Sequence, residues 1–406
     1  MKALLLENIH PLAVDILATA GFDVTTRTGA LSGEELQQAL AGVTLLGIRS
    51  TTEVTADVLD AAPQLQAIGA FCIGTNQIDL SAAAELGIAA FNAPYSNTRS
   101  VVELVIAEVI ALHRRLTDHN QALHAGTWDK SAAGAHEVRG RTLGIVGYGN
   151  IGSQLSVIAE ALGMRVVFYD TAEKLALGNA RFCATLGELL AVADAVTLHV
   201  DGRPGNAGLF GRAEFAAMKP GGLFLNLSRG FVVDYAALRE EISSGRLAGA
   251  AVDVFPNEPR RRGDAFVSEL TGLPNVILTP HVGGSTEEAQ VDIGRFVAGK
   301  LRDFHLTGQT SLSVNLPPLS PEPRPGTCRI THVHRNTPGV MAAANQVMAD
   351  HKINIEAQQL ATRGDLGYAV TDVACEAAGD AAHALLTELR AMPETVRVRL
   401  LTTSGS

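Results

Sequence analysis

The first 95 residues alternate short apolar runs with stretches whose apolar residues recur at helical spacing. The helical stretches lie near residues 10–20, 32–41, 55–61 and 79–86. The apolar runs between them are ALLLEN, FDVTTRT, TLLGIRS, QLQAIGAF and IAAFNAP, each short enough for one buried strand. Strands that alternate with helices form parallel sheets with helices on both faces. This part of the chain is therefore predicted to be a small α/β domain, and it carries no glycine-rich nucleotide motif.

A longer α/β block occupies the middle of the chain, between two long helical patterns. Residues 98–124 predict one helix with a broad apolar face, and residues 285–306 predict another. Strand and helix patterns alternate between them, which is typical of a doubly wound sheet. The strands are expected at 143–146, 165–169, 195–199, 223–227, 249–254 and 275–279. Because long helices bound this block on both sides, we expect it to be inserted into the first domain.

The last part of the chain differs in composition and in the order of its elements. Residues 317–326, PPLSPEPRPG, contain five prolines, which is typical of an extended linker. The patterns that follow run strand, helix, strand, strand, helix, strand, the order of a ferredoxin-like fold. We therefore predict an α/β protein with two doubly wound parallel-sheet domains, one flavodoxin-like and one Rossmann, and a ferredoxin-like third domain. The expected boundaries are 1–97 with 286–316, 98–285, a linker at 317–326, and 327–406.

One stretch of the middle block carries the signature of a dinucleotide-binding βαβ unit. An apolar run ending at Val146 meets the sequence GYGNIG, and a helical pattern and a second apolar run follow. The second run ends in Asp170, 18 residues after Gly152. Such a unit places pyrophosphate on the helix N-terminus and the acid on the ribose. Because a carboxylate there accepts from the ribose 2′-hydroxyl and repels a 2′-phosphate, we predict NAD rather than NADP. The alternative is a glycine turn without a ligand.

Three polar residues directly follow strands of the same block. They are Arg229 in NLSRG, Glu258 in DVFPNEP and His281 in LTPHVGG. Ligands of open α/β sheets lie beyond the carboxyl ends of the strands, so these residues are expected on the rim that carries the glycines. Histidine can take the hydroxyl proton of an alcohol near neutral pH, a carboxylate can hold its tautomer, and a guanidinium can bind a substrate carboxylate. The alternatives are a helix cap for His281, a solvated turn for Glu258 and a surface charge for Arg229.

The first domain offers residues that can bind an anion. Arg49 and Ser50 end its third strand, and Thr51 and Thr52 continue a hydroxyl-rich turn suited to phosphate. Asn97 and Arg99 follow the fifth strand in NAPYSNTRS. Helix N-capping is the alternative role for Ser50–Thr52 and for Ser96–Thr98.

Composition narrows the classes of partner. A net charge of −10 argues against nucleic acid or an anionic membrane, and an anionic substrate then needs a local cluster of arginines. The first apolar run is broken by Glu7 and Asn8, so it is not a signal peptide, and no stretch is long enough to span a membrane. The four cysteines lie far apart without metal-ligand spacing, which favours reduced thiols in a cytoplasmic protein and no metal.

NAPYSNTRSVVE, GYGNIG, NLSRG, DVFPNEP and TPHVGGSTEEAQ together resemble the D-isomer-specific 2-hydroxyacid dehydrogenases, and the last domain resembles an amino-acid-sensing ACT domain. The resemblance implies that Arg229, Glu258 and His281 are catalytic. It implies substrate contacts for Arg49, Ser50, Asn97 and Gln290. It implies NAD contacts for Gly147, Tyr148, Gly149, Asn150, Ile151, Gly152, Asp170, His199, Asp253, Gly283 and Gly284. In the last domain, it implies a serine site made by His334, Asn336 and Asn354.

The resemblance also implies a reaction, a regulator and an assembly. The expected reaction is NAD-dependent oxidation of 3-phospho-D-glycerate to 3-phosphohydroxypyruvate, with 2-oxoglutarate reduction as a side reaction and serine as a feedback inhibitor. A homotetramer with paired NAD domains and paired ACT domains is expected, and Trp128 and Lys130 resemble a segment that reaches the neighbouring subunit. The departures from the family pattern are Arg335, where an acid is common, the basic run Arg260–Arg262, and the glycine-rich stretch 201–210. The alternatives are a glyoxylate, hydroxypyruvate or 2-hydroxyglutarate dehydrogenase, or a non-catalytic NAD-sensing scaffold.

Overall fold

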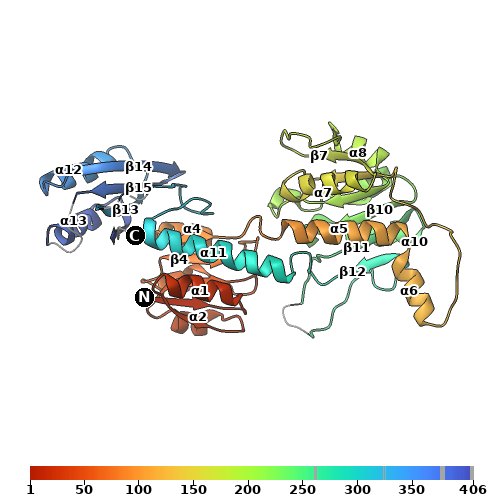
Figure 1. Ribbon diagram of the computed structural model, residues 1–406, viewed down its shortest axis with the longest axis horizontal. Helices are drawn as coiled ribbons and strands as arrows, with labels where there is room; N and C mark the ends of the chain where they lie inside the picture. The colour runs from red at the N-terminus through yellow and green to blue at the C-terminus, as the bar shows by residue number, and fades with distance from the viewer. Residues whose placement is uncertain (260–262, 323, 325, 375–379, 403–406) are drawn as a thin grey trace. The chain divides into compact units, whose positions relative to one another are not determined.

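A computed structural model describes residues 1–259, 263–322, 324, 326–374 and 380–402. The chain divides into two compact units, Met1–Pro94 with Gln290–Ser406, and Tyr95–Ala289 (Figure 1). The first unit contains a five-stranded and a four-stranded sheet, and the second contains a seven-stranded sheet. The domain boundaries expected near 97 and 286 stay predictions, as does the boundary of the third domain. The basic run at 260–262 lies outside the described residues.

The five-stranded sheet of the first unit is parallel and has the order β2-β1-β3-β4-β5. Successive residues of its strands belong to two different apolar clusters, for example Leu45 to one and Leu46 to the other. Both faces are therefore buried, as the alternation of apolar runs and helices predicts. The elements are β1 (Lys2–Leu5), α1 (Pro11–Thr19), β2 (Asp23–Thr26), α2 (Gly33–Ala39), β3 (Val43–Ile48), α3 (Ala56–Asp60), β4 (Ala67–Ala70), α4 (Leu80–Glu85), β5 (Ala89–Phe91) and the late helix α11 (Glu287–Thr307).

The seven-stranded sheet is also parallel, in the order β12-β11-β10-β9-β6-β7-β8. The strand order reverses between β6 and β9, which is where an open α/β sheet binds its ligand. The six predicted strands are confirmed, and the short β8 is additional. The elements are α5 (Thr98–His113), α6 (Leu116–His124), β6 (Thr142–Val146), α7 (Asn150–Ala161), β7 (Arg165–Tyr169), β8 (Arg181–Phe182), α8 (Leu186–Val192), β9 (Ala195–Leu198), α9 (Arg212–Ala217), β10 (Gly222–Asn226), α10 (Tyr235–Ser243), β11 (Leu247–Val252) and β12 (Val276–Leu278).

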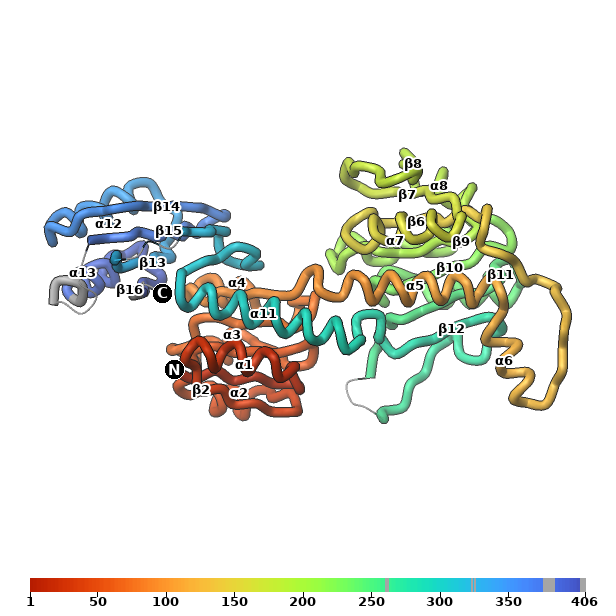
Figure 2. Tube along the Cα trace, viewed as in Figure 1, coloured from red at the N-terminus to blue at the C-terminus, as the bar shows by residue number. Residues whose placement is uncertain are grey.

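The single helix predicted over residues 98–124 is wrong. The structure breaks it after His113, and Figure 2 shows α6 leaving the direction of α5. Arg115 has a φ of 49°, a left-handed conformation that no α-helix can continue through. Its guanidinium donates to Asp118 over 2.8 Å, and the second oxygen of Asp118 accepts from the backbone N–H of Asn275, just before β12. A tertiary contact therefore sets the break, and the apolar pattern could not reveal it.

The four-stranded sheet has the predicted strand–helix–strand–strand–helix–strand order. It is antiparallel, with the strand order β14-β15-β13-β16. The predicted ferredoxin-like arrangement is therefore confirmed. The elements are β13 (Cys328–Arg335), α12 (Val340–Asp350), β14 (Ile355–Arg363), β15 (Leu366–Val373), α13 (Asp380–Ala391) and β16 (Thr395–Thr402).

Within the first unit, the buried Arg329 and the half-buried Arg399 tie this sheet to the end of α11. Arg329 is fully buried, pairs with Asp372 in bidentate fashion at 2.7 and 2.9 Å, and donates to the Thr307 carbonyl. Arg399 donates to the His305 carbonyl over 2.9 Å and lies over the Phe304 ring. The carbonyls at a helix C-terminus lack helical partners and carry partial negative charge, so guanidinium donors suit them.

Among the described residues, no helix is both long enough and apolar enough to cross a membrane.

Helix α5 buries an acid against the seven-stranded sheet. Glu108 is 3% exposed, and neither of its carboxyl oxygens has a hydrogen-bond partner among the described residues. Burial, together with the nearby charge of Asp253, raises the pKa of Glu108 from 4.5 to about 8. The folded protein therefore holds this side chain as the neutral acid at neutral pH.

Replacing Glu108 by Gln should stabilise the protein at high pH more than at low pH. The native acid costs no ionisation energy below a pH of 4.5, and its burial becomes a penalty as the pH rises from 4.5 toward about 8. The extra stabilisation at about pH 8.5 relative to about pH 5 is on the order of 4 kcal/mol. Thermal unfolding at both pH values measures it, with Glu103→Gln on the exposed face of α5 as the control. An equal effect of Glu108→Gln at both pH values would contradict the assignment.

Candidate active site

The glycine turn between β6 and α7 has the geometry of a pyrophosphate cradle. A β-carbon on Gly147, which has a φ of +93°, would lie 2.5 Å from the His199 carbonyl oxygen. A β-carbon on Gly152 would lie 2.3 Å from the Gly147 carbonyl oxygen, so both positions exclude a side chain. By contrast, the space next to Gly149 is open. Gly149 is also the N-cap of α7 and supplies no side-chain bond to the first helical N–H groups, which are free to meet an anion.

Asp170 lies beside this turn, at the end of β7. One of its oxygens accepts from the backbone N–H of Tyr148 over 2.8 Å, and the other accepts from Ala172 over 2.9 Å. The Tyr148 side chain is buried, stacks on Phe168 and bonds to Ser156, so only its backbone can face a nucleotide. Asn150 and Ile151 form the first turn of α7. The residues present therefore fit the pyrophosphate and ribose of NAD.

His199 follows β9, across the switch point from the glycine turn. Its Nε2 pairs with the Thr197 hydroxyl over 3.0 Å, and its Nδ1 is buried without a partner among the described residues. Burial lowers its pKa to about 3, so the ring is neutral. A buried, unpaired ring nitrogen beside a cofactor cradle suits a polar group of the cofactor.

Asp253 holds the loop that carries His281. This carboxylate is 1% exposed and accepts from the Thr279 hydroxyl at 2.6 Å and from the backbone N–H groups of Val282 and Gly283, both at 2.8 Å. The loop needs such support because His281 has a φ of 54°, which non-glycine residues seldom adopt. A direct contact between Asp253 and NAD stays a prediction.

His281 and Glu258 form a hydrogen-bonded pair. The ring Nδ1 lies 2.8 Å from Oε2 of Glu258, and Oε1 of Glu258 accepts from the backbone N–H of Phe255. A carboxylate can only accept, so Nδ1 carries the proton and Nε2 is left as the acceptor. The bond to Glu258 raises the pKa of His281 against the effects of burial and of the Arg229 charge. Burial raises the pKa of Glu258, but hydrogen bonds from His281 and Phe255 outweigh it and hold that pKa below its ordinary value.

Arg229 is placed through its backbone by a buried asparagine. Asn226, at the end of β10, is fully buried, and its Nδ2 donates to the Arg229 carbonyl and to the Tyr235 hydroxyl, both at 3.0 Å. Its Oδ1 accepts from the N–H and the hydroxyl of Ser228. The Arg229 charge lowers the pKa of both Glu258 and His281. Arg229 is therefore close enough to influence both members of the pair, as the strand-end argument predicts.

Among the other roles considered for these residues, the structure argues against helix capping by His281. The N–H of Ala289 in the first turn of α11 is capped by the Thr286 hydroxyl rather than by His281. Glu258 is held by two hydrogen bonds and is not a free turn residue.

The residues expected to contact substrate are divided between the two units. Arg49, Ser50 and Gln290 belong to the first unit and Asn97 to the second. The Asn97 side chain does not cap α5, and its Oδ1 is buried without a partner among the described residues. A β-carbon on Gly284 would lie 2.2 Å from Asn97 Nδ2, so that glycine allows the asparagine to sit against the His281 loop.

The structure removes Thr52 from the expected phosphate cradle, and a role for the exposed Thr51 hydroxyl stays a prediction. Thr52 is fully buried, and the backbone N–H groups of both threonines are taken by the Glu7 carboxylate. Helix capping by Ser50–Thr52 is wrong, because α3 begins at Ala56 with Thr55 at its N-cap. The turn thus leaves the side chains of Arg49, Ser50 and Thr51 as its groups for an anion.

The three residues expected to bind serine do not come together within one chain. His334 is 1% exposed, its Nδ1 donates to the Arg335 carbonyl, and its Nε2 is buried without a partner among the described residues. Asn336 lies just beyond the same end of β13 and donates to the Gly364 carbonyl. Asn354 directly precedes Ile355 in β14. Ile355 and Cys328 are both register partners of Val373, so Asn354 lies at the opposite end of the sheet, near Cys328. With about 3.3 Å per residue, the two ends are about 20 Å apart.

Several residues that shape the site were not predicted from the sequence. Asn226 and Thr279 position Arg229 and the His281 loop, and Glu7 positions the Arg49 turn. All three residues end or follow strands. The expectation that site residues lie at the carboxyl ends of the strands, which identified Arg229, therefore applies to them too. In the described part of the chain, no group of three or more His, Cys, Asp or Glu is placed to hold a metal ion.

Comparison with known proteins identifies the family of this chain. Residues 106–283 match the NAD binding domain of the D-isomer specific 2-hydroxyacid dehydrogenases, and residues 330–397 match the AHAS small subunit-like ACT domain. The chain belongs to the D-isomer specific 2-hydroxyacid dehydrogenase family, and it binds NAD.

Two relatives that align over most of the chain are D-3-phosphoglycerate dehydrogenases. The chain is 48% identical over 402 residues to D-3-phosphoglycerate dehydrogenase of Escherichia coli, covering 99% of this chain and 97% of the relative. It is 46% identical over 385 residues to D-3-phosphoglycerate dehydrogenase 1 of Saccharomyces cerevisiae, covering 92% and 82%. A crystal structure of D-lactate dehydrogenase from Aquifex aeolicus, complexed with NAD and lactic acid, is similar with a TM-score of 0.65 and 25% identity, covering 74% of this chain and 95% of that one.

Replacing Gly230 by Ala should damage the site through its backbone. A β-carbon there would lie 2.1 Å from the carbonyl carbon of Phe255, whose N–H holds Glu258. Moving that turn shifts Arg229 and Glu258 together, and a displacement of about 1 Å costs on the order of 10²-fold in turnover. Initial rates and NADH binding measure the effect, and we expect NADH binding to be retained. Gly205→Ala, where the added carbon meets nothing within 4 Å, is the control. Turnover at the wild-type level in Gly230→Ala would refute the packing argument.

Proposed function

We propose that this chain oxidises 3-phospho-D-glycerate to 3-phosphohydroxypyruvate with NAD⁺, the first step of phosphorylated serine synthesis. The observation that carries the proposal is the hydrogen-bonded pair of His281 and Glu258 beyond strands of the sheet that bears the glycine turn. The relatives that align over nearly the whole chain are named for this activity. An NAD-sensing scaffold would have no need of a histidine in a left-handed conformation paired to a carboxylate.

The side chains divide the chemistry of alcohol oxidation between them. NAD⁺, when bound, accepts the hydride that leaves C2 of the substrate. Nε2 of His281 takes the proton of the C2 hydroxyl, and Glu258 stabilises the imidazolium that forms. Arg229 binds the substrate carboxylate and holds C2 in register with the base. In the reverse reduction, the protonated His281 returns its proton to the carbonyl oxygen.

Asp170 supports the choice of NAD over NADP. Its carboxylate is fixed beside the glycine turn by two backbone N–H groups. In that place it accepts from the ribose 2′-hydroxyl and repels a 2′-phosphate.

Arg49 and Ser50 supply the phosphate contacts in this proposal, with Asn97 and Gln290 as further substrate contacts. Arg49 is half-buried and Ser50 is exposed, and both lie at the carboxyl end of β3. Charge recognition of this kind also admits 2-oxoglutarate, whose second carboxylate would take the place of the phosphate. Glyoxylate, hydroxypyruvate and 2-hydroxyglutarate are the alternative substrates. The first two have no second anionic group for Arg49 to bind, and 2-hydroxyglutarate offers a carboxylate in place of the phosphate.

Serine is the proposed effector, and its site needs two copies of the ACT domain. His334 and Asn336 lie at one end of the sheet and Asn354 at the other, so one chain offers two partial sites. The exposed strand β14 is the edge of that sheet, and pairing of two copies would complete both sites. Arg335, adjacent to His334, places a positive charge beside this end of the sheet, which disfavours a cationic ligand there.

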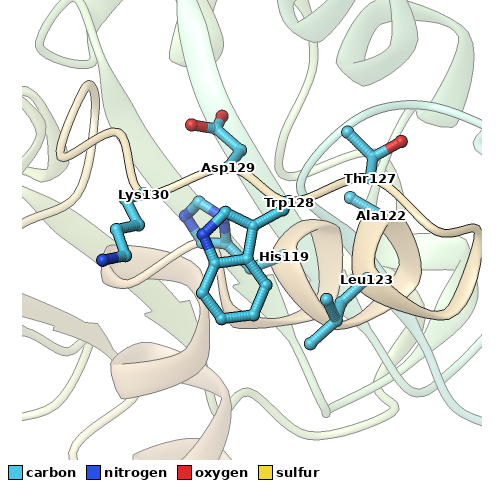
Figure 3. Close-up of a pocket in the computed structure, with 7 residues that line it drawn as sticks. All are labelled: His119, Ala122, Leu123, Thr127, Trp128, Asp129 and Lys130. Carbon is cyan, nitrogen blue, oxygen red and sulfur yellow. The ribbon is translucent and has the colours of Figure 1, made fainter.

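A homotetramer in the cytoplasm is the proposed form of the protein. The second unit exposes three large apolar side chains on α6 and the segment after it, Leu116, Leu123 and Trp128, the last of them 74% exposed. Figure 3 shows Trp128 beside His119, in a pocket that Leu123 also lines. Large exposed apolar side chains on one helix and the segment after it are typical of a subunit contact, so we assign them to the pairing of NAD domains. The ACT domains form the second contact.

Initial rates over a panel of D-2-hydroxy acids and their 2-oxo acids test the function. We expect 3-phosphoglycerate to be oxidised, and 3-phosphohydroxypyruvate to be reduced with a higher kcat/KM than hydroxypyruvate or glyoxylate. L-Serine should lower the rate, and His334→Ala should abolish that effect while leaving the uninhibited rate unchanged. If an unphosphorylated acid is preferred, that acid is the substrate and the proposed one is wrong. Inactivity on the whole panel would favour a non-catalytic NAD-sensing scaffold.

His281→Ala serves as the matched variant in the same assay. Loss of the base should lower turnover by roughly 10²–10⁴ while NADH binding is kept. A rate close to that of the wild type would remove His281 from the mechanism.

A further inference from the structure

The turn that carries Arg49 is built around a carboxylate from a neighbouring strand. In the sheet order β2-β1-β3-β4-β5, the switch point lies between β1 and β3, where doubly wound domains bind their ligands. Glu7 follows β1 and Arg49 follows β3. The two segments therefore meet at the edge where a ligand is expected.

Glu7 fills an anion site made of backbone N–H groups. Its Oε1 accepts from Arg49 at 3.0 Å and from Thr52 at 2.9 Å, and its Oε2 accepts from Thr51 at 3.0 Å. Three converging backbone N–H groups form a nest of the kind that binds phosphate in other folds. In this protein the nest holds the chain's own carboxylate, and Glu7 is only 9% exposed.

The backbone around Glu7 is held in a conformation that it would not adopt alone. Glu7 has a φ of 62° and Asn8 a φ of 56°, two successive left-handed residues without a glycine. Such strain persists where the surroundings fix it, and it gathers at functional sites. The Glu7 N–H donates to the Gly29 carbonyl and the Asn8 N–H donates to the Arg27 carbonyl, so the loops after β1, β2 and β3 are joined at this point.

A second buried side chain, that of Gln77, binds the backbone carbonyl of Arg49. Nε2 of Gln77 donates to the Arg49 carbonyl over 2.6 Å and to the Gly74 carbonyl over 3.2 Å. Gln77 is 7% exposed. The N–H of Arg49 is thus held by Glu7 and its C=O by Gln77, while its side chain remains available for a ligand.

The charge of Glu7 is maintained at working pH. Burial raises its pKa, but hydrogen bonds from Thr52, Thr51 and Arg49 outweigh burial and hold the pKa below its ordinary value. An ionised acceptor makes these bonds stronger than a neutral one would.

We propose that Glu7 is a positioning residue for substrate: its carboxylate, with Gln77, fixes the Arg49–Ser50 turn so that their side chains meet the substrate phosphate. This rests on the proposed function, in which Arg49 and Ser50 contact that phosphate. Because the Glu7 carboxylate already occupies the backbone N–H groups of the nest, the substrate phosphate must be recognised by the Arg49 guanidinium and the Ser50 hydroxyl. Loss of the carboxylate should therefore weaken recognition of phosphate specifically, with less effect on the hydride transfer step.

Glu7→Gln tests the proposal in the full-length enzyme. Its amide oxygen can replace Oε1, but its NH₂ group faces the Thr51 N–H and leaves that donor unpaired. We expect the KM for 3-phosphohydroxypyruvate to rise by about tenfold, the loss of one charge-assisted hydrogen bond, with kcat and the KM for NADH near the wild-type values. The KM for hydroxypyruvate, which lacks the phosphate, should change little.

Glu7→Asp keeps both oxygens and should recover part of the loss. Glu34→Gln, which removes an exposed charge from α2, is the control.

A chemical rescue separates positioning from general damage to the fold. Glycine adopts the φ of 62° without strain, so Glu7→Gly removes the carboxylate and leaves the nest empty. Added formate should enter the nest and lower the KM for 3-phosphohydroxypyruvate in this variant, while in the wild type it should act only as a weak inhibitor. Absence of rescue, with an equal rise in KM for both oxo acids in Glu7→Gln, would overturn the proposal.

Arg49→Ala, measured in the same assay, separates a failure of the positioning role of Glu7 from a failure of the proposed function. If it abolishes the preference for the phosphorylated acid while Glu7→Gln retains that preference, the positioning role is wrong and the proposed function stands. If Arg49→Ala leaves the preference intact, the proposed role of Arg49 is wrong, and the positioning role of Glu7 falls with it.

Discussion

The active site depends on one buried carboxylate, Asp253, which accepts three hydrogen bonds from the segment 279–283. Two of the donors are backbone N–H groups, so the bonds fix the path of the chain as well as its position. His281 lies inside this segment with a φ of 54°, a conformation that costs about 1–2 kcal/mol for a side chain that is not glycine. Without Asp253 the loop would relax, and His281 would lose the orientation in which Glu258 can hold its Nδ1.

Carboxylates that accept backbone N–H groups of a loop are also found at other strand ends of this protein. Glu7 accepts three backbone N–H groups from the Arg49 turn, and Asp170 accepts one from the glycine turn and one from its own loop. Loops at the carboxyl edge of a parallel sheet have no ladder to satisfy their N–H groups, and an ionised carboxylate satisfies two or three at once. Reacting side chains are thereby presented from rigid backbone although they stand on loops.

Much of the fold followed from the alternation of apolar runs and helical patterns, which located the strands of both parallel sheets and the order of the last domain. The strand-end rule placed Arg229, Glu258 and His281 on one rim, because parallel strands share their carboxyl edge. Glu7 was taken only as the end of an apolar run, since a buried acid looks the same in sequence as an exposed one. The break at Arg115 depends on Asp118 and Asn275, a contact 157 residues apart in the chain, which local patterns do not contain. Likewise, the motif that matched His334 and Asn354 could not show that they stand at opposite ends of a sheet.

Titration of His281 by NMR tests the central claim, that Glu258 sets the protonation of the base. The protein has twelve histidines, and the His281→Asn spectrum identifies the resonance. In the free wild-type protein its pKa should lie above 6.5, because the bond to Glu258 favours the charged ring, and Glu258→Gln should bring it below 6.5, since burial and the Arg229 charge remain. A pKa that is the same in both proteins would contradict the account.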